Sequence, residues 1–273
     1  MTGRIPAIAL AGWCLLAAGC GKRTVAKPSG LKFADIEFGK GEEAKSGDWI
    51  EIHSTGWRQA DETKFDSSRE DNKTPYLFLL GVGQEIRGWD EGIVGMKPGG
   101  KRKLFVPAAM AFGDTDQGTL LPPNSDLVFE IELLRIVKGF ATEELRAGSG
   151  REAKWLDVVK VRYTGWIKES GKEFENNYDK DTPYVFRIGG RIDQVLLIGG
   201  REQKVSPAIK GWDGGVVGMK VGSKRKITIP AELGYGSKGL GLVPADADLV
   251  FNVELIDIED NPPEIQPDTG TTP

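Results

Sequence analysis

The stretch GWDGGVVGMKVGSKRKITIPA at residues 211–231 decides the fold of this chain, because a close copy of it occurs earlier in the same chain. Residues 88–108 read GWDEGIVGMKPGGKRKLFVPA, and fourteen of the twenty-one positions are identical. The segments LVFEIELLRI (127–136) and LVFNVELIDI (249–258) repeat at nearly the same offset. Repeats of this length are whole domains rather than the roughly 20–50-residue units of a solenoid. The chain is therefore one small domain duplicated.

The composition limits the classes of function. The 273 residues suit two domains of common size once the ends are removed. A net charge of −4 without any basic block argues against nucleic acid as a partner. Both cysteines, Cys14 and Cys20, lie in the first twenty residues, and His53 is the single histidine. A zinc site takes roughly three or four ligands, so we predict neither a metal nor another cofactor.

Residues 1–20 are predicted to direct the chain to a membrane rather than to belong to a domain. Arg4 precedes an apolar run from Ile5 to Ala18, which is shorter than the roughly 20 residues that span a bilayer. The stretch LLAAGC resembles a bacterial lipoprotein signal, in which Cys20 becomes the lipidated first residue; an ordinary cleaved signal is the alternative. The resemblance implies a lipid anchor in the cell envelope. In a Gram-negative cell it implies the outer membrane, facing the periplasm.

The rest of the chain divides into two copies between flexible ends. We expect a flexible tether at 21–30 and a disordered tail, rich in proline, at 260–273. Domain 1 is expected at 31–137 and domain 2 at 138–259. Domain 2 contains a fifteen-residue insertion near 190–207 that domain 1 lacks.

Alternating apolar residues predict strands in both copies. Ile50, Ile52 and Ser54 share the inward face of one strand, which leaves His53 on the solvent side and not in a catalytic role. One short helix interrupts the strands of each copy, because apolar residues there fall at i, i+4 and i+7. These residues are Trp89, Ile93 and Met96 in domain 1 and Trp212, Val216 and Met219 in domain 2. Each copy is therefore an antiparallel sheet packed on one short helix, an α+β fold.

Six segments in order resemble the FKBP-type peptidyl-prolyl cis-trans isomerases. They are TGW, FDSS, a proline followed by an aromatic residue, IRGWDEG, a Pro-x-x-x-Ala-aromatic-Gly loop, and LPPNSDLVFEIEL. The resemblance covers both copies nearly end to end. It implies an FKBP-like fold, in which a curved antiparallel β-sheet wraps around the short α-helix. It also implies an apolar pocket that binds the Xaa-Pro segments of unfolded or nascent polypeptides.

In domain 2 the resemblance assigns a role to each pocket residue. Trp212 forms the floor, and aromatic side chains form the walls. The backbone N–H of Ile209 and the hydroxyl of Tyr235 contact substrate carbonyls. Glu175 replaces the usual aspartate and keeps its carboxylate one methylene further out. The expected catalytic set is Tyr163, Phe174, Glu175, Tyr184, Ile209, Trp212, Tyr235 and Phe251.

Domain 1 departs from this pattern at three positions. Ser54 stands where domain 2 has Tyr163, Phe112 stands at the position of Tyr235, and Glu85 precedes the pocket isoleucine. Losing an aromatic wall costs about 1.5–3 kcal/mol of burial, and losing one hydroxyl hydrogen bond about 0.5–1.5 kcal/mol. We therefore expect domain 2 to be the better catalyst. The substrate-binding set expected in domain 1 is Phe65, Asp66, Tyr76, Ile86, Trp89, Phe112, Leu121 and Phe129.

The insertion in domain 2 enters beside the expected pocket. Between Gly189 and Trp212 lie 22 residues, whereas seven lie between Gly81 and Trp89, which leaves fifteen extra residues. They form either a flap that grips unfolded chains, a lid that occludes the site, or a surface insertion without a role. Loop insertions cost little entropy, so their presence alone does not decide among these readings.

The predicted function is a prolyl isomerase that assists the folding of envelope or secreted proteins. The departures in both pockets leave an alternative open, a chaperone-like or scaffold module that holds proline-containing chains with little turnover. A purely structural role in the envelope is the third reading. The sequence does not define the oligomeric state.

Overall fold

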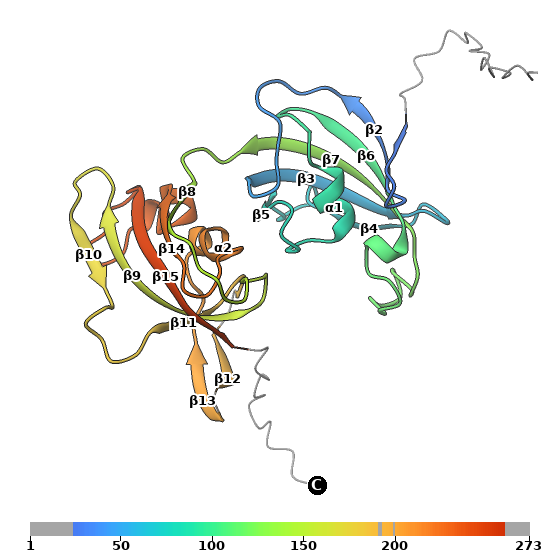
Figure 1. Ribbon diagram of the computed structural model, residues 1–273. Coiled ribbons are helices and arrows are strands. Elements are labelled where there is room, and N and C mark those ends of the chain that lie inside the picture. The colour runs from blue at the N-terminus through green and yellow to red at the C-terminus, as the bar shows by residue number, and fades with distance from the viewer. Residues whose placement is uncertain (1–23, 191–192, 199, 260–273) are drawn as a thin grey trace, which may run out of the picture.

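The computed structural model describes residues 24–190, 193–198 and 200–259. The expected signal peptide, Cys20 and the expected tail lie outside these residues. Two domains follow one another, each with an antiparallel sheet curved around one short helix (Figure 1). The α+β class and the FKBP-like arrangement are therefore confirmed. No helix in the described part of the chain is both long and apolar enough to cross a membrane.

Domain 1 contains a seven-stranded sheet in the order β1-β2-β6-β7-β3-β4, with β5 paired to β3. The helix α1 precedes β6, and a short 3₁₀ turn, η1, follows it. The elements are β1 (Val25–Ala26), β2 (Lys32–Glu37), β3 (Trp49–Arg58), β4 (Lys64–Ser67), β5 (Tyr76–Leu79), α1 (Arg87–Gly92), β6 (Lys101–Val106), η1 (Ala108–Met110) and β7 (Leu127–Ile136).

Domain 2 repeats this plan with a six-stranded sheet in the order β10-β9-β15-β14-β8, with β11 paired to β9. The insertion forms a separate two-stranded hairpin, β12–β13. The elements are β8 (Ala141–Arg146), β9 (Val158–Ile167), β10 (Glu173–Asn176), β11 (Tyr184–Arg187), β12 (Gln194–Ile198), β13 (Arg201–Val205), α2 (Lys210–Val216), β14 (Lys224–Ile229), η2 (Ala231–Leu233), η3 (Gly236–Lys238) and β15 (Leu249–Glu259).

Strand β3 shows why alternation predicts the sheet. Ile50, Ile52 and Ser54 are buried, while the residues between them are partly exposed. His53 therefore lies on the outer face, where its Nδ1 is 3.0 Å from the hydroxyl of Ser68. One face of the strand packs on the core and the other meets solvent, as expected for an antiparallel sheet.

Each helix lies directly against a neighbouring strand because two glycines face that strand. In domain 2, a Cβ added at Gly211 would come within 2.4 Å of Ile229, and one at Gly215 within 2.3 Å of Ile227. The matching contacts in domain 1 join Gly88 to Val106 and Gly92 to Leu104. A larger residue at any of these positions would push the helix and its tryptophan away from the sheet.

The Asp and Arg of the repeated motif hold each helix in place. Asp213 accepts a hydrogen bond from the N–H of Gly189 at 2.7 Å, which ties the helix to the loop after β11. Arg225 donates from Nη1 to the carbonyl oxygens of Gly215 (2.9 Å) and Val217 (3.1 Å) at the helix C-terminus. Asp90 and Arg102 make the matching bonds in domain 1. The motif therefore repeats because it positions the helix.

The helices are shorter than the i, i+4, i+7 spacing predicts. Helix α1 ends at Gly92 and α2 at Val216, so Met96 and Met219 follow the helices instead of belonging to them. Both methionines are nevertheless buried in the cores. The apolar spacing therefore predicted burial correctly, but the last apolar residue of each series, Met96 or Met219, lies in the turn after the helix.

Part of the expected tether is structured. Strand β1 pairs with β2, with Val25 opposite Phe33 and Ala26 opposite Lys32. The N–H of Lys27 also donates to the carbonyl of Leu31 at 2.8 Å. Domain 1 thus begins before Leu31, because Val25 and Ala26 complete a sheet edge by backbone pairing, although two residues are too few to show an alternating pattern.

The two domains share an apolar interface on helix α2. Trp49, Leu79 and Val137 of domain 1 are buried in the same cluster as the core of domain 2. A Cβ added at Gly214 would lie 2.7 Å from the Trp49 Nε1 and 3.4 Å from the Leu79 Cδ1. Glycine at this helix position therefore allows domain 1 to approach.

An ion pair accompanies the apolar contact between the domains. Arg135 on β7 donates from Nη1 and Nη2 to the two carboxylate oxygens of Glu232 in η2, at 2.9 and 2.7 Å. Its Nε donates to Glu51 of its own domain at 2.6 Å. A bidentate pair of this kind fixes orientation as well as distance, so the domains are docked in a defined way.

We expect Gly214→Glu to lower the free energy of unfolding by about 2 kcal/mol or more, because a carboxylate would have to enter the buried contact with Trp49. The reciprocal change, Glu91→Gly, alters the equivalent position of α1, where the side chain is 35% exposed. Its cost should be about 1 kcal/mol or less. Urea unfolding followed by tryptophan fluorescence measures both values. Equal losses in the two variants would contradict the docked interface.

Candidate functional site

A pocket of about 310 Å³ opens beside helix α2 in domain 2. The helix forms its base, and strands β9 and β15 and the loop after β14 surround it. The lining residues are Tyr163, Glu175, Tyr184, Pro207, Ala208, Ile209, Trp212, Tyr235, Leu240 and Phe251. Seven of the eight residues predicted for this site are among them.

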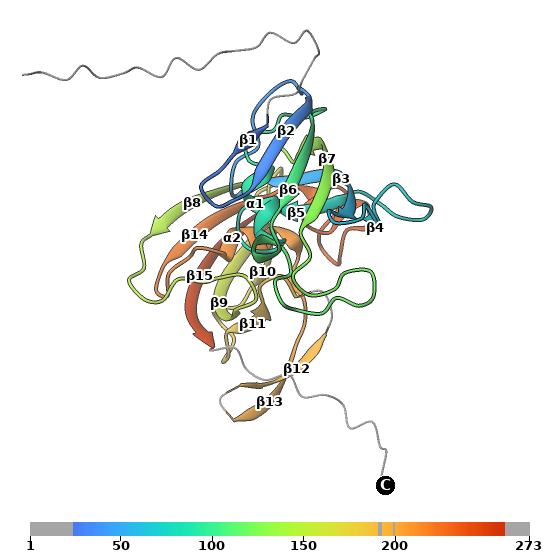
Figure 2. The same cartoon turned by 90° about the vertical axis from the view of Figure 1, so that its right-hand side faces the viewer.

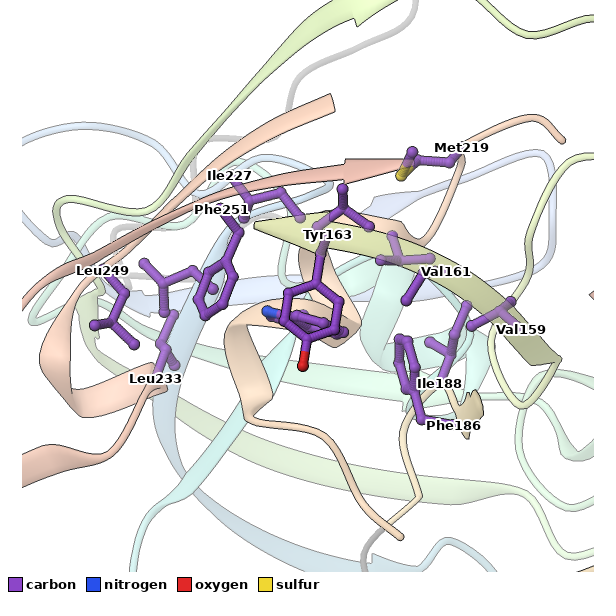
Figure 3. Packing of buried hydrophobic residues seen from close by; sticks show 14 of the residues in the cluster. Val159, Val161, Tyr163, Phe186, Ile188, Met219, Ile227, Leu233, Leu249 and Phe251 are labelled. Carbon is purple, nitrogen blue, oxygen red and sulfur yellow. The ribbon is translucent and has the colours of Figure 1, made fainter. Parts of the chain in front are cut away.

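Aromatic rings pack edge to face around Trp212. The ring of Tyr163 lies 4.6 Å from it at 81°, and the ring of Phe251 lies 5.2 Å away at 88°. Tyr184 completes the set at 5.7 Å and 87°. Figure 3 shows Tyr163 between Phe251 and Phe186, with its hydroxyl pointing away from the strand. Such edge-to-face pairs fix ring orientation, so the pocket is rigid and apolar.

Phe174 is the predicted residue that does not line the pocket directly. Its ring packs against Phe251 at 5.6 Å and 83°, which supports that wall from behind. Both rings cross over Gly165, where an added Cβ would lie 2.6 Å from Phe251 and 3.0 Å from Phe174. The glycine of the repeated TGW motif therefore makes room for the aromatic wall.

Three tyrosine hydroxyls, those of Tyr163, Tyr184 and Tyr235, and the carboxylate of Glu175 are the polar side-chain groups that line the pocket. Burial raises the pKa of Tyr163, and a hydrogen bond to Glu175 raises it further. Burial, followed by the nearby charge of Glu175, also raises the pKa of Tyr235. Both hydroxyls therefore stay protonated at neutral pH and can donate hydrogen bonds. Lys180 faces Glu175 at 4.0 Å across the rim.

Three lining residues were not predicted: Pro207, Ala208 and Leu240. The first two belong to the segment between the hairpin and α2, and they reach the pocket because Ile209 starts the helix. Leu240 lies in a glycine-rich loop and is 62% exposed. A leucine in a glycine-rich loop could have indicated a pocket residue, but no spacing rule distinguishes Leu240 from the nearby Leu242, which is 61% exposed.

Domain 1 brings a smaller aromatic set together around Trp89. Phe129 lies 5.4 Å from it at 83°, and Tyr76 lies 5.8 Å away. Phe65 packs edge to face on Phe129 at 5.7 Å. Ile86 and the buried Leu121 belong to the same apolar cluster, whereas Phe112 is 37% exposed. The predicted residues of domain 1 therefore converge, apart from the outward Phe112.

The acid of domain 1 has different partners from the acid of domain 2. Ser54 is buried where Tyr163 stands in domain 2, so no hydroxyl reaches the carboxylate from that strand. Asp66 instead accepts hydrogen bonds from the hydroxyl of Tyr76 at 2.5 Å and from Lys73 at 2.7 Å. Burial, followed by the bond to Asp66, raises the pKa of Tyr76. The Tyr76 hydroxyl is therefore already hydrogen-bonded within domain 1.

Glu85 introduces a second acid beside the domain 1 cluster. Burial, followed by the charge of Asp90, raises its pKa to about 7. Glu85 also contributes to the raised pKa of Tyr76, which places its charge near that ring. Ala208 occupies the matching position in domain 2. Domain 1 therefore carries a partly buried carboxylate where domain 2 has a methyl group.

The described residues contain no group of three or more His, Cys, Asp or Glu side chains arranged to hold a metal ion. The chemistry that the domain 2 pocket can perform is the binding of an apolar, partly extended group between aromatic rings. Two hydroxyls and one helix-terminal N–H at its edge can orient that group.

Comparisons with known proteins agree with this geometry. The family model of the FKBP-type peptidyl-prolyl cis-trans isomerases matches residues 40–134 and again residues 149–256. The FK506-binding protein of Neisseria meningitidis serogroup B is 50% identical over 107 residues, which cover 39% of this chain and 96% of that protein.

A longer relative matches both domains. The peptidyl-prolyl cis-trans isomerase FKBP10 of Homo sapiens is 34% identical over 228 residues, which cover 81% of this chain. The match covers 36% of the human protein, so the chain spans about a third of its length. Among solved structures, the crystal structure of AtFKBP13 is 40% identical, with a TM-score of 0.39, and the match covers 42% of this chain and 99% of that chain.

Glu85 should make the stability of the chain depend on pH. Its pKa rises from an ordinary 4.5 to about 7 on folding, so the folded state keeps a proton that the unfolded state loses. Stability therefore falls as pH rises through this window. The free energy of unfolding should therefore decrease less with pH in Glu85→Gln than in the parent, by about 1–2 kcal/mol when the partial exposure of Glu85 is taken into account. Urea unfolding of variant and parent at about pH 5 and about pH 8 measures it; parallel curves would contradict the assignment.

Proposed function

We propose that this chain, which belongs to the family of FKBP-type peptidyl-prolyl cis-trans isomerases, catalyses rotation about Xaa-Pro peptide bonds in the pocket of domain 2. The observation that carries the proposal is the ring of aromatic side chains around Trp212, closed on three sides and bordered by hydroxyl donors. The substrates are proline-containing segments of unfolded or nascent polypeptides.

The reaction needs this kind of pocket. Resonance gives the amide a rotation barrier of about 18–20 kcal/mol, and Xaa-Pro bonds isomerise unaided in tens to hundreds of seconds. No covalent bond is made or broken, so catalysis consists of binding the twisted amide better than the planar one. A twisted amide has lost resonance and is less polar. The apolar rings of Trp212, Tyr163 and Phe251 therefore favour it over the planar ground state.

Hydrogen-bond donors at the edge of the pocket hold the flanking carbonyl groups. The N–H of Ile209 precedes the first turn of α2, and among the described residues it has no hydrogen-bond acceptor. The hydroxyl of Tyr235 belongs to the same pocket and stays protonated. Together they can fix the two ends of a short segment while the prolyl bond between them rotates.

Domain 1 serves as an auxiliary binding domain in this proposal. Its cluster lacks the tyrosine wall, its Tyr76 hydroxyl is engaged by Asp66, and Glu85 adds a charge that titrates near neutral pH. Each difference weakens the stabilisation of a less polar, twisted amide. Domain 1 can still hold a chain whose proline is isomerised in domain 2.

The proposed place of action is the cell envelope. The motivation is the lipoprotein-like stretch that ends at Cys20, which would anchor the chain to a membrane. In a Gram-negative cell this would be the outer membrane, with the domains facing the periplasm. The substrates would then be envelope or secreted proteins that are still folding.

A binding module is the second candidate, and exposed apolar residues favour it. Leu240 and Leu242 are 62% and 61% exposed next to the pocket, where they can hold an unfolded chain without contributing to rotation. Suppression of aggregation without measurable isomerisation would support this candidate.

The activity is tested with a chymotrypsin-coupled assay on a proline tetrapeptide. Tyr163→Ser gives domain 2 the residue of domain 1, and we expect kcat/KM to fall about tenfold to a hundredfold because an aromatic wall is lost. Tyr235→Phe should cost at most about tenfold, the value of one hydroxyl hydrogen bond. Loss of an aromatic side chain from the domain 1 cluster by Phe65→Ser should leave kcat/KM within about twofold.

Two results would overturn the assignment. A loss with Phe65→Ser and none with Tyr163→Ser would make domain 1 the catalyst. A parent chain that does not exceed the uncatalysed rate would favour the binding module.

Anchoring is tested by cell fractionation and mass spectrometry. We expect Cys20→Ser to release the chain from the membrane fraction and to abolish a lipid-sized mass increase on the mature N-terminus. Cys14→Ser is the matched control, because Cys14 lies in the predicted leader and would be removed with it. An unmodified Cys20 on the mature chain would favour the ordinary cleaved signal.

A further inference from the structure

The hairpin β12–β13 packs on the outer side of domain 2. Leu196, Ile198 and Val205 of the hairpin form an apolar cluster with Val158, the first residue of β9, and with Val185 on β11. Leu196 and Val158 are fully buried there. The hairpin is therefore docked on the sheet through the strands β9 and β11.

The same positions in domain 1 are used for a different contact. Trp49 is the first residue of β3, as Val158 is of β9, and Leu77 takes the second position of β5, as Val185 does in β11. Trp49 and Leu77 pack into the core of domain 2, with Trp49 next to Gly214 of α2. One surface, present twice in the duplicated chain, thus binds a whole domain in the first copy and a hairpin in the second.

Both views show the resulting order. Domain 1, domain 2 and the hairpin follow one another, and the hairpin lies on the side of domain 2 away from domain 1 (Figure 1, Figure 2). We propose that the hairpin is a cap that covers a duplicated docking surface, here defined as Val158 and Val185, and prevents a second copy of this chain from binding there.

The hairpin itself has the composition of a cap. Its inner face carries the buried apolar residues, whereas its outer face places Val195 opposite Lys204 and Leu197 opposite Glu202. Lys204 also forms an ion pair with Asp193 at 2.6 Å. Terminal units of tandem arrays need a polar outer face, because their neighbours on that side are missing. Here Lys204 and Glu202 place a charge beside each of the exposed side chains Val195 and Leu197.

The other end of the tandem is closed as well. Helix α1 carries Glu91 where α2 carries Gly214, and the hydroxyl of Ser29 donates to the Glu91 carboxylate at 2.7 Å. Lys27 donates to the carbonyl of the same residue. The helix surface that receives domain 1 in the second copy is therefore covered by a charged side chain and the N-terminal segment in the first. The hairpin at one end and the N-terminal segment at the other therefore exclude a second copy of this chain, because the surfaces that they cover correspond to those through which the chain binds its own domains.

The proposal is tested by shortening the hairpin. Residues 190–207 are replaced by Val-Gly-Gln, the sequence at 82–84 of domain 1, in a chain that lacks only residues 1–20. Sedimentation velocity over a wide concentration range compares it with the parent. We expect concentration-dependent association through the uncovered surfaces of two chains, because helices α1 and α2 both stay covered. The apparent mass should approach twice that of the parent.

Val185→Lys in the shortened chain is the matched reversal, because it places a charge on the uncovered surface and should restore the sedimentation of the parent. Leu196→Asp in the chain that keeps the whole hairpin weakens the packing of the hairpin on the sheet without removing it, and should also increase association. Native tryptophan fluorescence reports that domain 2 remains folded.

Sedimentation like that of the parent for both the shortened and the Leu196→Asp chains would overturn the proposal. Association that Val185→Lys does not reverse would overturn it too, since the contact would then not involve the surface under the hairpin.

Discussion

Contact between a short helix and a strand, at a distance that only glycine allows, is the constraint on which each domain depends. Gly211 and Gly215 let α2 lie on Ile229 and Ile227, and the position of Trp212 between them follows from that contact. Asp213 and Arg225 then secure the two ends of the helix. The aromatic wall can form around Trp212 because the helix cannot move away from the sheet without losing these contacts.

Much of this arrangement could be predicted because it depends on local periodicity and on the repeat. Alternation revealed strands such as β3, whose inward residues are buried as expected. The end of α2 could not be predicted, because Met219 is buried by a turn that continues the helical spacing. Strand β1 could not be predicted either, since its two residues, Val25 and Ala26, are exposed and too few to show an alternating pattern. Leu240 reaches the pocket through the path of a loop, which side-chain patterns do not encode.

The two pockets differ by more than the number of their rings. In domain 2 the carboxylate of Glu175 holds Tyr163, a wall residue, and leaves Tyr235 available for a substrate. In domain 1 the shorter Asp66 holds Tyr76 and Lys73. Ser54 in place of the wall tyrosine and the different partners of the acid are therefore linked, because a carboxylate with no tyrosine on the neighbouring strand accepts from the nearest other donors.

Helix α2 also connects catalysis to the arrangement of the domains. It has seven residues, and its faces are all in use: Gly211 and Gly215 on β14, Trp212 in the pocket, and Gly214 against Trp49. Helix α1 has Glu91 instead of that last glycine, and its outer side meets the N-terminal segment. The domain with the complete aromatic set is thus the one whose helix packs against the other domain. Domain 1 therefore supports the helix that carries Trp212, so that the docking of the two domains and the geometry of the domain 2 pocket depend on the same seven residues.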